Sequence, residues 1–198
     1  STPASAPASP TLPIYSVETD EKVVAVTFDA AWNADDIDNI IGTLDKYGCK
    51  ATFFAVGDWL VKYPDAVKKL SGAGHEIANH SDTHAHLNTL STEKLITEME
   101  ECDKKILDLT GVKNVLCRAP YGEYNDNVIT TCYQSGRYPI QWDIDSLDWK
   151  NLTTEEMIKR IVPKLKNGSI ILLHNGTENT AGALPSILEA IKNEGYSF

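Results

Sequence analysis

Five apolar segments of this sequence each end in a side chain that can bind a metal ion, transfer a proton or carry charge. The segments are 23–28, 75–79, 114–117, 138–142 and 169–173, and the residues after them are Asp29, His80, Arg118, Asp143 and His174. In parallel α/β folds the carboxyl ends of the strands share one face, where active sites are assembled. We therefore expect these five side chains to converge.

The segment HSDTH adds a second histidine, His84, four residues after His80. This spacing places two imidazoles on one side of a helical turn, an arrangement that suits Zn²⁺ or a similar ion. An HxxxH pattern alone is a weak signal, but its position at a strand end, near an acid and another histidine, favours a metal site. We expect His75, at a strand start, and His86, in the following loop, to be structural.

Short apolar runs alternate with amphipathic stretches along the chain, which predicts βαβ units. The expected strands are 23–28, 51–56, 75–80, 114–118, 138–143 and 169–174, with a further one starting near Tyr196. The expected helices are about 35–47, 58–72, 91–109, 125–135, 153–166 and 182–194. We predict an α/β fold, a distorted (β/α) barrel of about seven parallel strands that is incomplete at its C-terminal end. A flavodoxin-like open sheet is the alternative.

The amino-acid composition limits the kinds of partner that the protein can be expected to bind. The formal charge of −10 argues against nucleic acid and anionic membranes, and favours a neutral substrate. No apolar run approaches the roughly 20 residues of a membrane span. Residues 1–13, built almost entirely from Ser, Thr, Pro and Ala, predict a tether before one domain at 14–198, which suits a secreted or cell-surface protein. We expect a monomer with buried free cysteines, although one disulfide stays open.

Five motifs in order resemble those of the polysaccharide deacetylases of carbohydrate esterase family 4, the NodB-homology domain. They are TFDAAW (27–32), HSDTH (80–84), RAPYG (118–122), DIDSLDW (143–149) and ILLH (171–174). The resemblance covers roughly residues 22–198. It implies a deacetylase with one divalent metal ion, Zn²⁺ being favoured and Co²⁺, Ni²⁺ or Mn²⁺ being alternatives.

The resemblance also implies roles for particular residues. For metal and proton chemistry these are Asp29 as general base, His80 and His84 as metal ligands, Arg118 beside the base, the Tyr121 backbone N–H as oxyanion donor, His174 as general acid and Asp148 as the carboxylate that orients it. For substrate contacts they are Trp32, Pro120, Trp149 and Leu172. The other two tryptophans, Trp59 and Trp142, are expected in the core.

The first motif departs from the family pattern. The family carries a second acid, the third protein ligand of the metal, where this sequence has Ala30. A water molecule, Asp29, or one of Asp35 and Asp36 would have to supply the missing metal ligand. We favour the first two, because an acid at a helix start more often serves the helix dipole. TFDAAW resembles sporulation- and clostridial-type deacetylases, so we expect a variant site with weaker metal binding.

Three functions remain as hypotheses. The first is removal of acetyl from amino sugars of peptidoglycan or chitin-type oligomers, and the second is de-esterification of acetylxylan by the same machinery. The third is a non-catalytic glycan-binding module that lost its metal through Ala30. The acidic run Glu98, Glu100, Glu101 and Asp103 is expected to be a solvated helix face.

Overall fold

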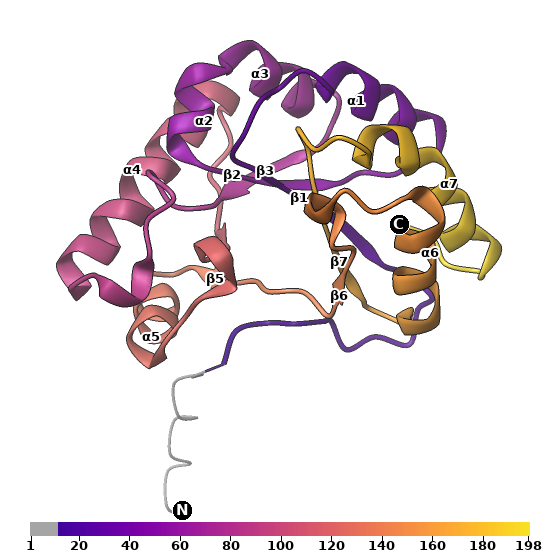
Figure 1. The fold of residues 1–198 in the computed structure, drawn as a ribbon. Coiled ribbons are helices and arrows are strands. Elements are labelled where there is room, and N and C mark those ends of the chain that lie inside the picture. Colours follow the sequence, from indigo (N-terminus) through magenta and orange to yellow (C-terminus); the bar gives the residue numbers. More distant parts are fainter. Residues whose placement is uncertain (1–11) are drawn as a thin grey trace, which may run out of the picture.

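The computed structural model describes residues 12–198, and its centre is a curled sheet of parallel strands. The strands are β1 (Ala25–Ala30), β2 (Thr52–Ala55), β3 (Glu76–Asn79), β4 (Leu116–Cys117), β5 (Tyr138–Pro139), β6 (Ile144–Asp145) and β7 (Ile170–His174). Their order is β5-β4-β3-β2-β1-β7-β6. The sheet forms a half-barrel that opens between β5 and β6 (Figure 1). The predicted α/β fold is confirmed.

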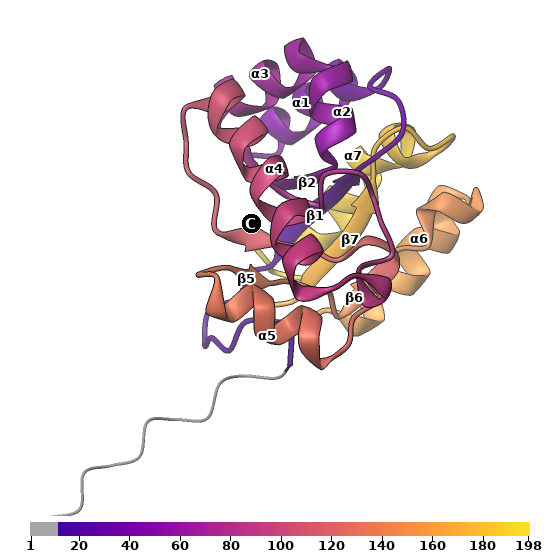
Figure 2. The same ribbon diagram turned by 90° about the vertical axis from the view of Figure 1, so that its left-hand side faces the viewer.

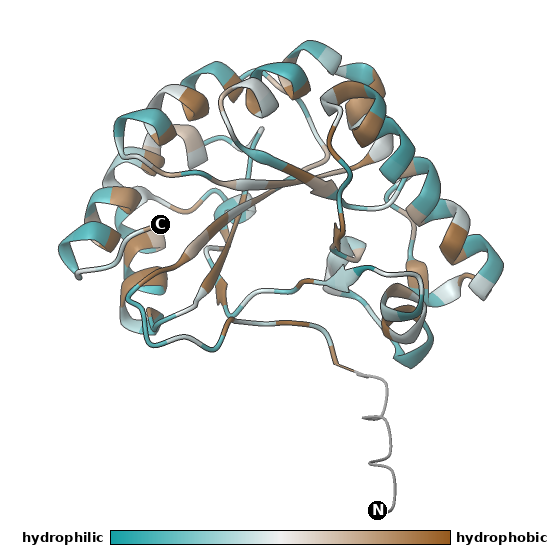
Figure 3. Cartoon of the chain, turned by 180° about the vertical axis from the view of Figure 1, so that it is seen from behind, coloured by the Kyte–Doolittle hydropathy of each residue, from teal (hydrophilic) through white to brown (hydrophobic). Residues whose placement is uncertain are grey.

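Helices cover the convex side of this half-barrel (Figures 1 and 2). They are α1 (Ile37–Lys46), α2 (Gly57–Lys62), α3 (Pro64–Gly72), α4 (Thr92–Thr110), α5 (Asp126–Gln134), α6 (Thr154–Ile161) and α7 (Thr180–Asn193). Short 3₁₀ turns lie at Leu87–Thr89, Pro120–Gly122, Asp148–Lys150 and Val162–Lys164. The helices turn their hydrophobic sides to the sheet and their hydrophilic sides outward (Figure 3), so the main core lies between the two layers.

The central strand β1 sends alternate side chains to opposite faces of the sheet. Phe28 and Ala30 are fully buried in the core under the helices, whereas Thr27 and Asp29 face the concave side. Ala30, which stands where the family has its second acid, therefore contributes its methyl group to the core under the helices.

Two predicted elements are each broken in two. The helix expected at 58–72 divides between Tyr63 and Pro64, because proline cannot supply the N–H that a continuous helix needs and begins a new helix instead. The strand expected at 138–143 pairs with β4 only at Tyr138–Pro139; the chain then crosses the open side of the half-barrel and pairs with β7 as β6.

Because of this second break, Asp143 does not join the other strand-end residues as the sequence predicted. Its carboxylate accepts the backbone N–H of Ile170 at 2.7 Å and the hydroxyl of Ser169, at the amino end of β7. This is the opposite end of the sheet from Asp29 and His174. Asp143 is therefore a structural residue.

The open side of the half-barrel is crossed by the segment that precedes β1. Ile14 donates its N–H to Pro139 and accepts that of Gln141, and Val17 donates to Gly168. Gly168 has φ 78°, and a Cβ there would lie 1.8 Å from the Val17 carbonyl oxygen, so glycine is required at this crossing. The strand expected near Tyr196 is reduced to one isolated bridge between Val23 and Ser197.

The predicted tether, 1–13, lies almost wholly outside the described residues, so it and the boundary at 14 stay predictions. Within 12–198, no helix combines the length and apolarity needed to cross a bilayer. The four cysteines are buried and free.

Candidate active site

A cavity of about 580 Å³ opens at the carboxyl ends of the strands. Eight of the residues singled out in the sequence line it: Asp29, Trp32, His80, His84, Tyr121, Trp149, Leu172 and His174. Arg118 and Asp148 are fully buried behind its wall, each bonded to a lining residue. Pro120 is buried and is not among the lining residues.

Asp29 is held by a buried arginine. Its Oδ1 accepts Nη1 of Arg118 at 2.9 Å, and the same nitrogen donates to the hydroxyl of Thr27 at 3.0 Å. The carbonyls of Ile140 and Gln141 accept hydrogen bonds from Nε and Nη2, so each of the three guanidinium nitrogens of Arg118 is hydrogen-bonded. The hydrogen bond from Arg118 therefore holds the Asp29 carboxylate in place.

The pKa of Asp29 lies below its ordinary value. Burial raises it, but the nearby cationic groups, namely His80 when it is protonated, Arg118 and His174, outweigh that effect. The carboxylate is thus ionised and able to accept a proton.

The HSDTH segment is a loop, which corrects the expected helical turn. Ser81 and His84 have left-handed φ values of 66° and 59°, and His84 donates its N–H to the Ser81 hydroxyl. The two imidazoles nevertheless meet, with ring centroids 5.0 Å apart. Tyr121, also left-handed at φ 65°, contacts the His84 ring at a tilt and stacks on His86. Such residues cost about 1–3 kcal/mol each and concentrate at functional sites.

Helix α4 secures this loop. Glu98 accepts the backbone N–H groups of Asp82 and Thr83 and the Thr83 hydroxyl, and Lys105 pairs with Asp82. A Cβ at Gly57, where α2 begins, would overlap Asp82, so glycine permits the close approach. The expectation that Glu98 is merely solvated is therefore wrong.

The same correction applies to Asp103, which accepts hydrogen bonds from Asn79 and Arg137. Glu100 and Glu101 are exposed as expected.

His174 lies beside Asp29 across the β1–β7 pairing and is oriented by Asp148. The Nδ1 of His174 donates to Oδ1 of Asp148 at 2.8 Å, because a carboxylate oxygen can only accept. Oδ2 of Asp148 accepts the His174 backbone N–H and the hydroxyl of Thr180. Burial lowers the pKa of His174, but the hydrogen bond and charge of Asp148, with the charge of Asp29, leave it above its ordinary value.

The histidine pair fits a metal ion in its donor chemistry. The Nδ1 of His80 must carry a proton, since its partner at 2.8 Å is the carbonyl oxygen of Arg118. Burial lowers the pKa of His80, so the ring is neutral and the lone pair of its Nε2 faces Oδ2 of Asp29 at 3.4 Å. Two electron-rich atoms face each other there, as ligands of one cation would.

Few side chains of the cavity are available as metal ligands. Within residues 12–198, no group of three or more His, Cys, Asp or Glu side chains has the geometry of a metal cluster. Asp35 is exposed, and Asp36 accepts the Gly176 N–H; neither lines the cavity. Of the expected replacements for the missing acid, these two are therefore excluded by position.

Aromatic side chains form the rim of the cavity. Trp32 stacks on His174 with ring centroids 5.3 Å apart, and both Trp32 and Trp149 are about half exposed. Trp142 lines the wall of the cavity, so the expectation that it belongs to the core is wrong. Trp59 does belong to the core, as expected. His75, one of the two histidines expected to be structural, is buried and accepts the backbone N–H of Ala51.

Sequence reasoning missed several contributors: Thr27, Gly122, Trp142, Asp145 and Thr180. Thr27, Gly122 and Asp145 carry a signal, because they stand inside recognised motifs. The others act through contacts distant in sequence.

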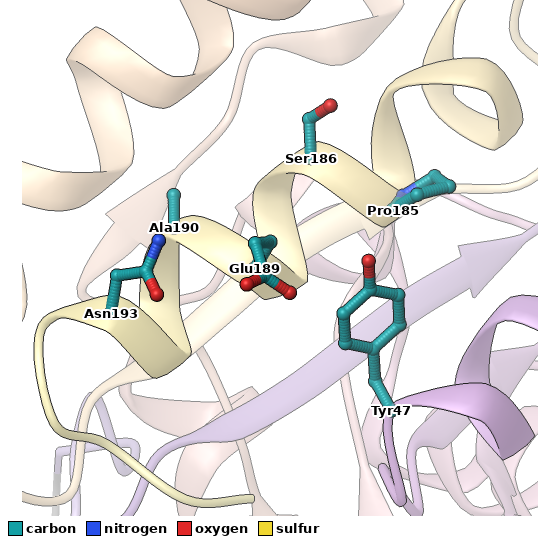
Figure 4. Close-up of a pocket in the computed structure, with 6 residues that line it drawn as sticks. All are labelled: Tyr47, Pro185, Ser186, Glu189, Ala190 and Asn193. Atoms are coloured by element: carbon teal, nitrogen blue, oxygen red, sulfur yellow. The ribbon is translucent and has the colours of Figure 1, made fainter.

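A second hollow of about 290 Å³ lies on the outer surface, between Tyr47 and helix α7 (Figure 4). Its lining holds a single carboxylate, Glu189, and no histidine. The chemistry of the described residues is concentrated in the first cavity.

Comparison with known proteins identifies the family. Residues 16–139 match the polysaccharide deacetylase family model, and the chain belongs to this family, whose named relatives are hydrolases that deacetylate carbohydrates. A peptidoglycan-N-acetylglucosamine deacetylase of Bacillus cereus is 33% identical over 93% of this chain and 88% of its own length. The Listeria monocytogenes enzyme PgdA is 30% identical over 97% of this chain, which spans 41% of PgdA.

Among solved structures, BA3943 of Bacillus anthracis superimposes with a TM-score of 0.90 at 29% identity, covering 95% of this chain and 66% of that one. It is described as a family 4 pseudoenzyme, and one mutant of it as having restored enzymatic activity.

Proposed function

We propose that this chain is a metal-dependent carbohydrate deacetylase that hydrolyses N- or O-acetyl groups. The observation that carries the proposal is the meeting, in one cavity, of an ionised carboxylate beside two imidazoles and of a third imidazole backed by a buried carboxylate. A hydrolase needs one group that accepts a proton from water and another that delivers one to the leaving group, and the two sides of this cavity supply them.

Asp29 acts as the general base. Its low pKa keeps it ionised, and Arg118 fixes its Oδ1 while Oδ2 faces the cavity beside His80. His174 acts as the general acid, since its raised pKa favours the imidazolium and its bond to Asp148 leaves Nε2 to donate. The backbone N–H of Tyr121 is assigned to the developing oxyanion, where one such donor is worth about 3–4 kcal/mol.

His80 and His84 would hold the metal ion, with Asp29 or water completing its ligands. A divalent ion there would polarise the acetyl carbonyl and lower the pKa of water from about 15.7 toward 7. Zn²⁺ suits two imidazoles best, and Co²⁺, Ni²⁺ and Mn²⁺ are alternatives. Because Ala30 supplies no third acid, we expect weak binding.

Glu98 gives a test of this metal site that is independent of turnover. Replacing Glu98 with Ala removes three hydrogen bonds that shape the loop carrying His84, and we expect Zn²⁺ affinity to fall about 10- to 100-fold. Isothermal titration measures it. Glu101→Ala, on the exposed face of the same helix, is the matched control and should bind as the parent does; equal affinities for the two variants would contradict the assigned positioning role.

The substrate is assigned as a neutral acetylated glycan. Half-exposed Trp32 and Trp149 offer flat faces to sugar rings, Leu172 offers an apolar wall to the acetyl methyl group, and the charge of −10 disfavours anionic polymers. The relatives named for peptidoglycan favour amino sugars of the cell wall, with acetylxylan as the runner-up. The same names support a cell-wall-related location, and we propose a secreted or cell-surface protein that acts as a monomer.

The proposal is tested by acetate release from chitooligosaccharides, peptidoglycan fragments and acetylxylan in the presence of Zn²⁺ or Co²⁺. We expect turnover on the amino sugars and less on acetylxylan. Equal or greater release from acetylxylan would reverse that preference, and no release from any substrate would contradict the enzymatic assignment.

A non-catalytic glycan-binding module is the second candidate. It is favoured by Ala30 and by the similarity to BA3943. Against it stands the intact bonding of Asp29 to Arg118 and of His174 to Asp148, which binding alone does not require. Calorimetric binding of chitooligosaccharides without acetate release at any metal concentration would establish this candidate.

The raised pKa of His174 has a consequence for the pH profile. The acid form is lost as pH rises through that pKa, so activity should decline on the alkaline side at a pH above the ordinary pKa of histidine. Asp148→Asn removes the charge that raises the pKa and should move this decline to lower pH. The pH dependence of kcat/KM measures the shift; an unchanged alkaline limb would remove His174 from the acid role.

A further inference from the structure

Two cysteines outside the cavity lie in direct contact. Sγ of Cys117, at the end of β4, is 3.3 Å from Sγ of Cys132, in α5, and both side chains are about 1% exposed. The contact is a hydrogen bond between thiols, and closing it to the roughly 2.05 Å of a disulfide needs a movement of little more than 1 Å. The two residues are 15 positions apart.

The other cysteines are not placed to compete. Cys49 and Cys102 belong to the core between the sheet and its helices, and Cys102 donates to the Ala55 carbonyl. Cys117 and Cys132 belong to a separate, smaller cluster under α4 and α5. The fold therefore favours one of the six pairs in which four cysteines can form a single disulfide.

We propose that Cys117 and Cys132 are a modification site that forms a disulfide when the chain folds in oxidising surroundings. The bond would tie α5 to the two-residue strand β4, which delivers Arg118 to the active site. This inference does not rest on the deacetylase function.

In the folded chain the hydrogen bond from Cys117 lowers the pKa of Cys132, whereas the same bond raises that of Cys117. Before α5 packs against β4 this bond does not exist, so either thiolate can begin the exchange.

The oxidant is a small-molecule or protein disulfide. One of the two thiolates attacks one of its sulfurs, forms a mixed disulfide and expels one thiolate. The other cysteine then loses its proton, attacks the sulfur of the first and expels the second thiolate, so two protons and two electrons leave the chain for each bond formed. Because both sulfurs are buried, the exchange belongs to the stage of folding before α5 covers Cys117.

The test is refolding of the denatured chain with dithiothreitol or with a glutathione redox buffer, followed by thiol counting in denaturant and peptide mapping. In the oxidised sample we expect two titratable thiols in place of four and a bridge between Cys117 and Cys132. A 15-residue loop predicts a melting temperature about 6–12 °C above that of the reduced sample.

Matched variants separate the pair from the other cysteines. Cys132→Ser should keep the thiol count the same in both buffers and abolish the difference in melting temperature, whereas Cys49→Ser should retain both effects. Four free thiols in every buffer, or a bridge to Cys49 or Cys102, would overturn the proposal. A mapped Cys117–Cys132 bridge that lowers the melting temperature would overturn the claim that the folded geometry accommodates it.

Discussion

Replacing Asp29 with Asn is expected to reduce the rate of acetate release about 10²- to 10⁴-fold, the usual contribution of a general base. The amide cannot accept the proton of the attacking water. The fold should survive, because Asn retains an oxygen for Nη1 of Arg118 and the guanidinium keeps its bonds to Thr27 and two carbonyls. We expect a loss of about 1–3 kcal/mol in unfolding free energy, from weakening a bond to a buried charge.

The measurement is kcat/KM under metal saturation, together with a urea unfolding curve. Asp143→Asn is the matched control, since Asp143 is also a partly buried carboxylate next to a strand but binds the amino end of β7. It should lose stability without losing turnover per folded molecule. Comparable rates for Asp29→Asn and the parent would remove Asp29 from the base role.

Removal of the metal ion is expected to have an effect of similar size. Chelation should lower acetate release about 100-fold or more, since polarisation by a divalent ion is worth several kcal/mol, and added Zn²⁺ or Co²⁺ should restore it. His80→Ala should lose activity that added metal does not restore, because the variant lacks the Nε2 that faces Asp29.

The measurement pairs acetate release with metal content before and after dialysis against chelator. Ala30→Asp would place a carboxylate in the helix-facing core, on the opposite face of β1 from Asp29, so we expect it to lower the melting temperature without tightening Zn²⁺ binding. Full turnover by the metal-stripped parent would end the mechanism proposed above.

Much of this arrangement follows from the sequence alone. The apolar runs that end at Asp29, His80 and His174 are strands, because continuous burial on both faces demands such runs. Parallel alternation then brings their carboxyl ends together, and the motif order identified the family. Alternation within β1 also follows from local periodicity, which sends Asp29 and Ala30 to opposite faces.

The tertiary structure alone decided where the chain departs from local periodicity. Residues 138–143 look like one strand, yet Gln141 bonds to Ile14 and Ile144, the residue after this segment, pairs with Ile171, so Asp143 faces away from the site. HSDTH has helical spacing, yet hydrogen bonds that its backbone N–H groups donate to Glu98 hold it as a loop. Burial patterns and motif spacing are properties of neighbours in sequence, whereas strand partners and loop shapes depend on groups more than a dozen residues away, whose approach only the folded chain determines.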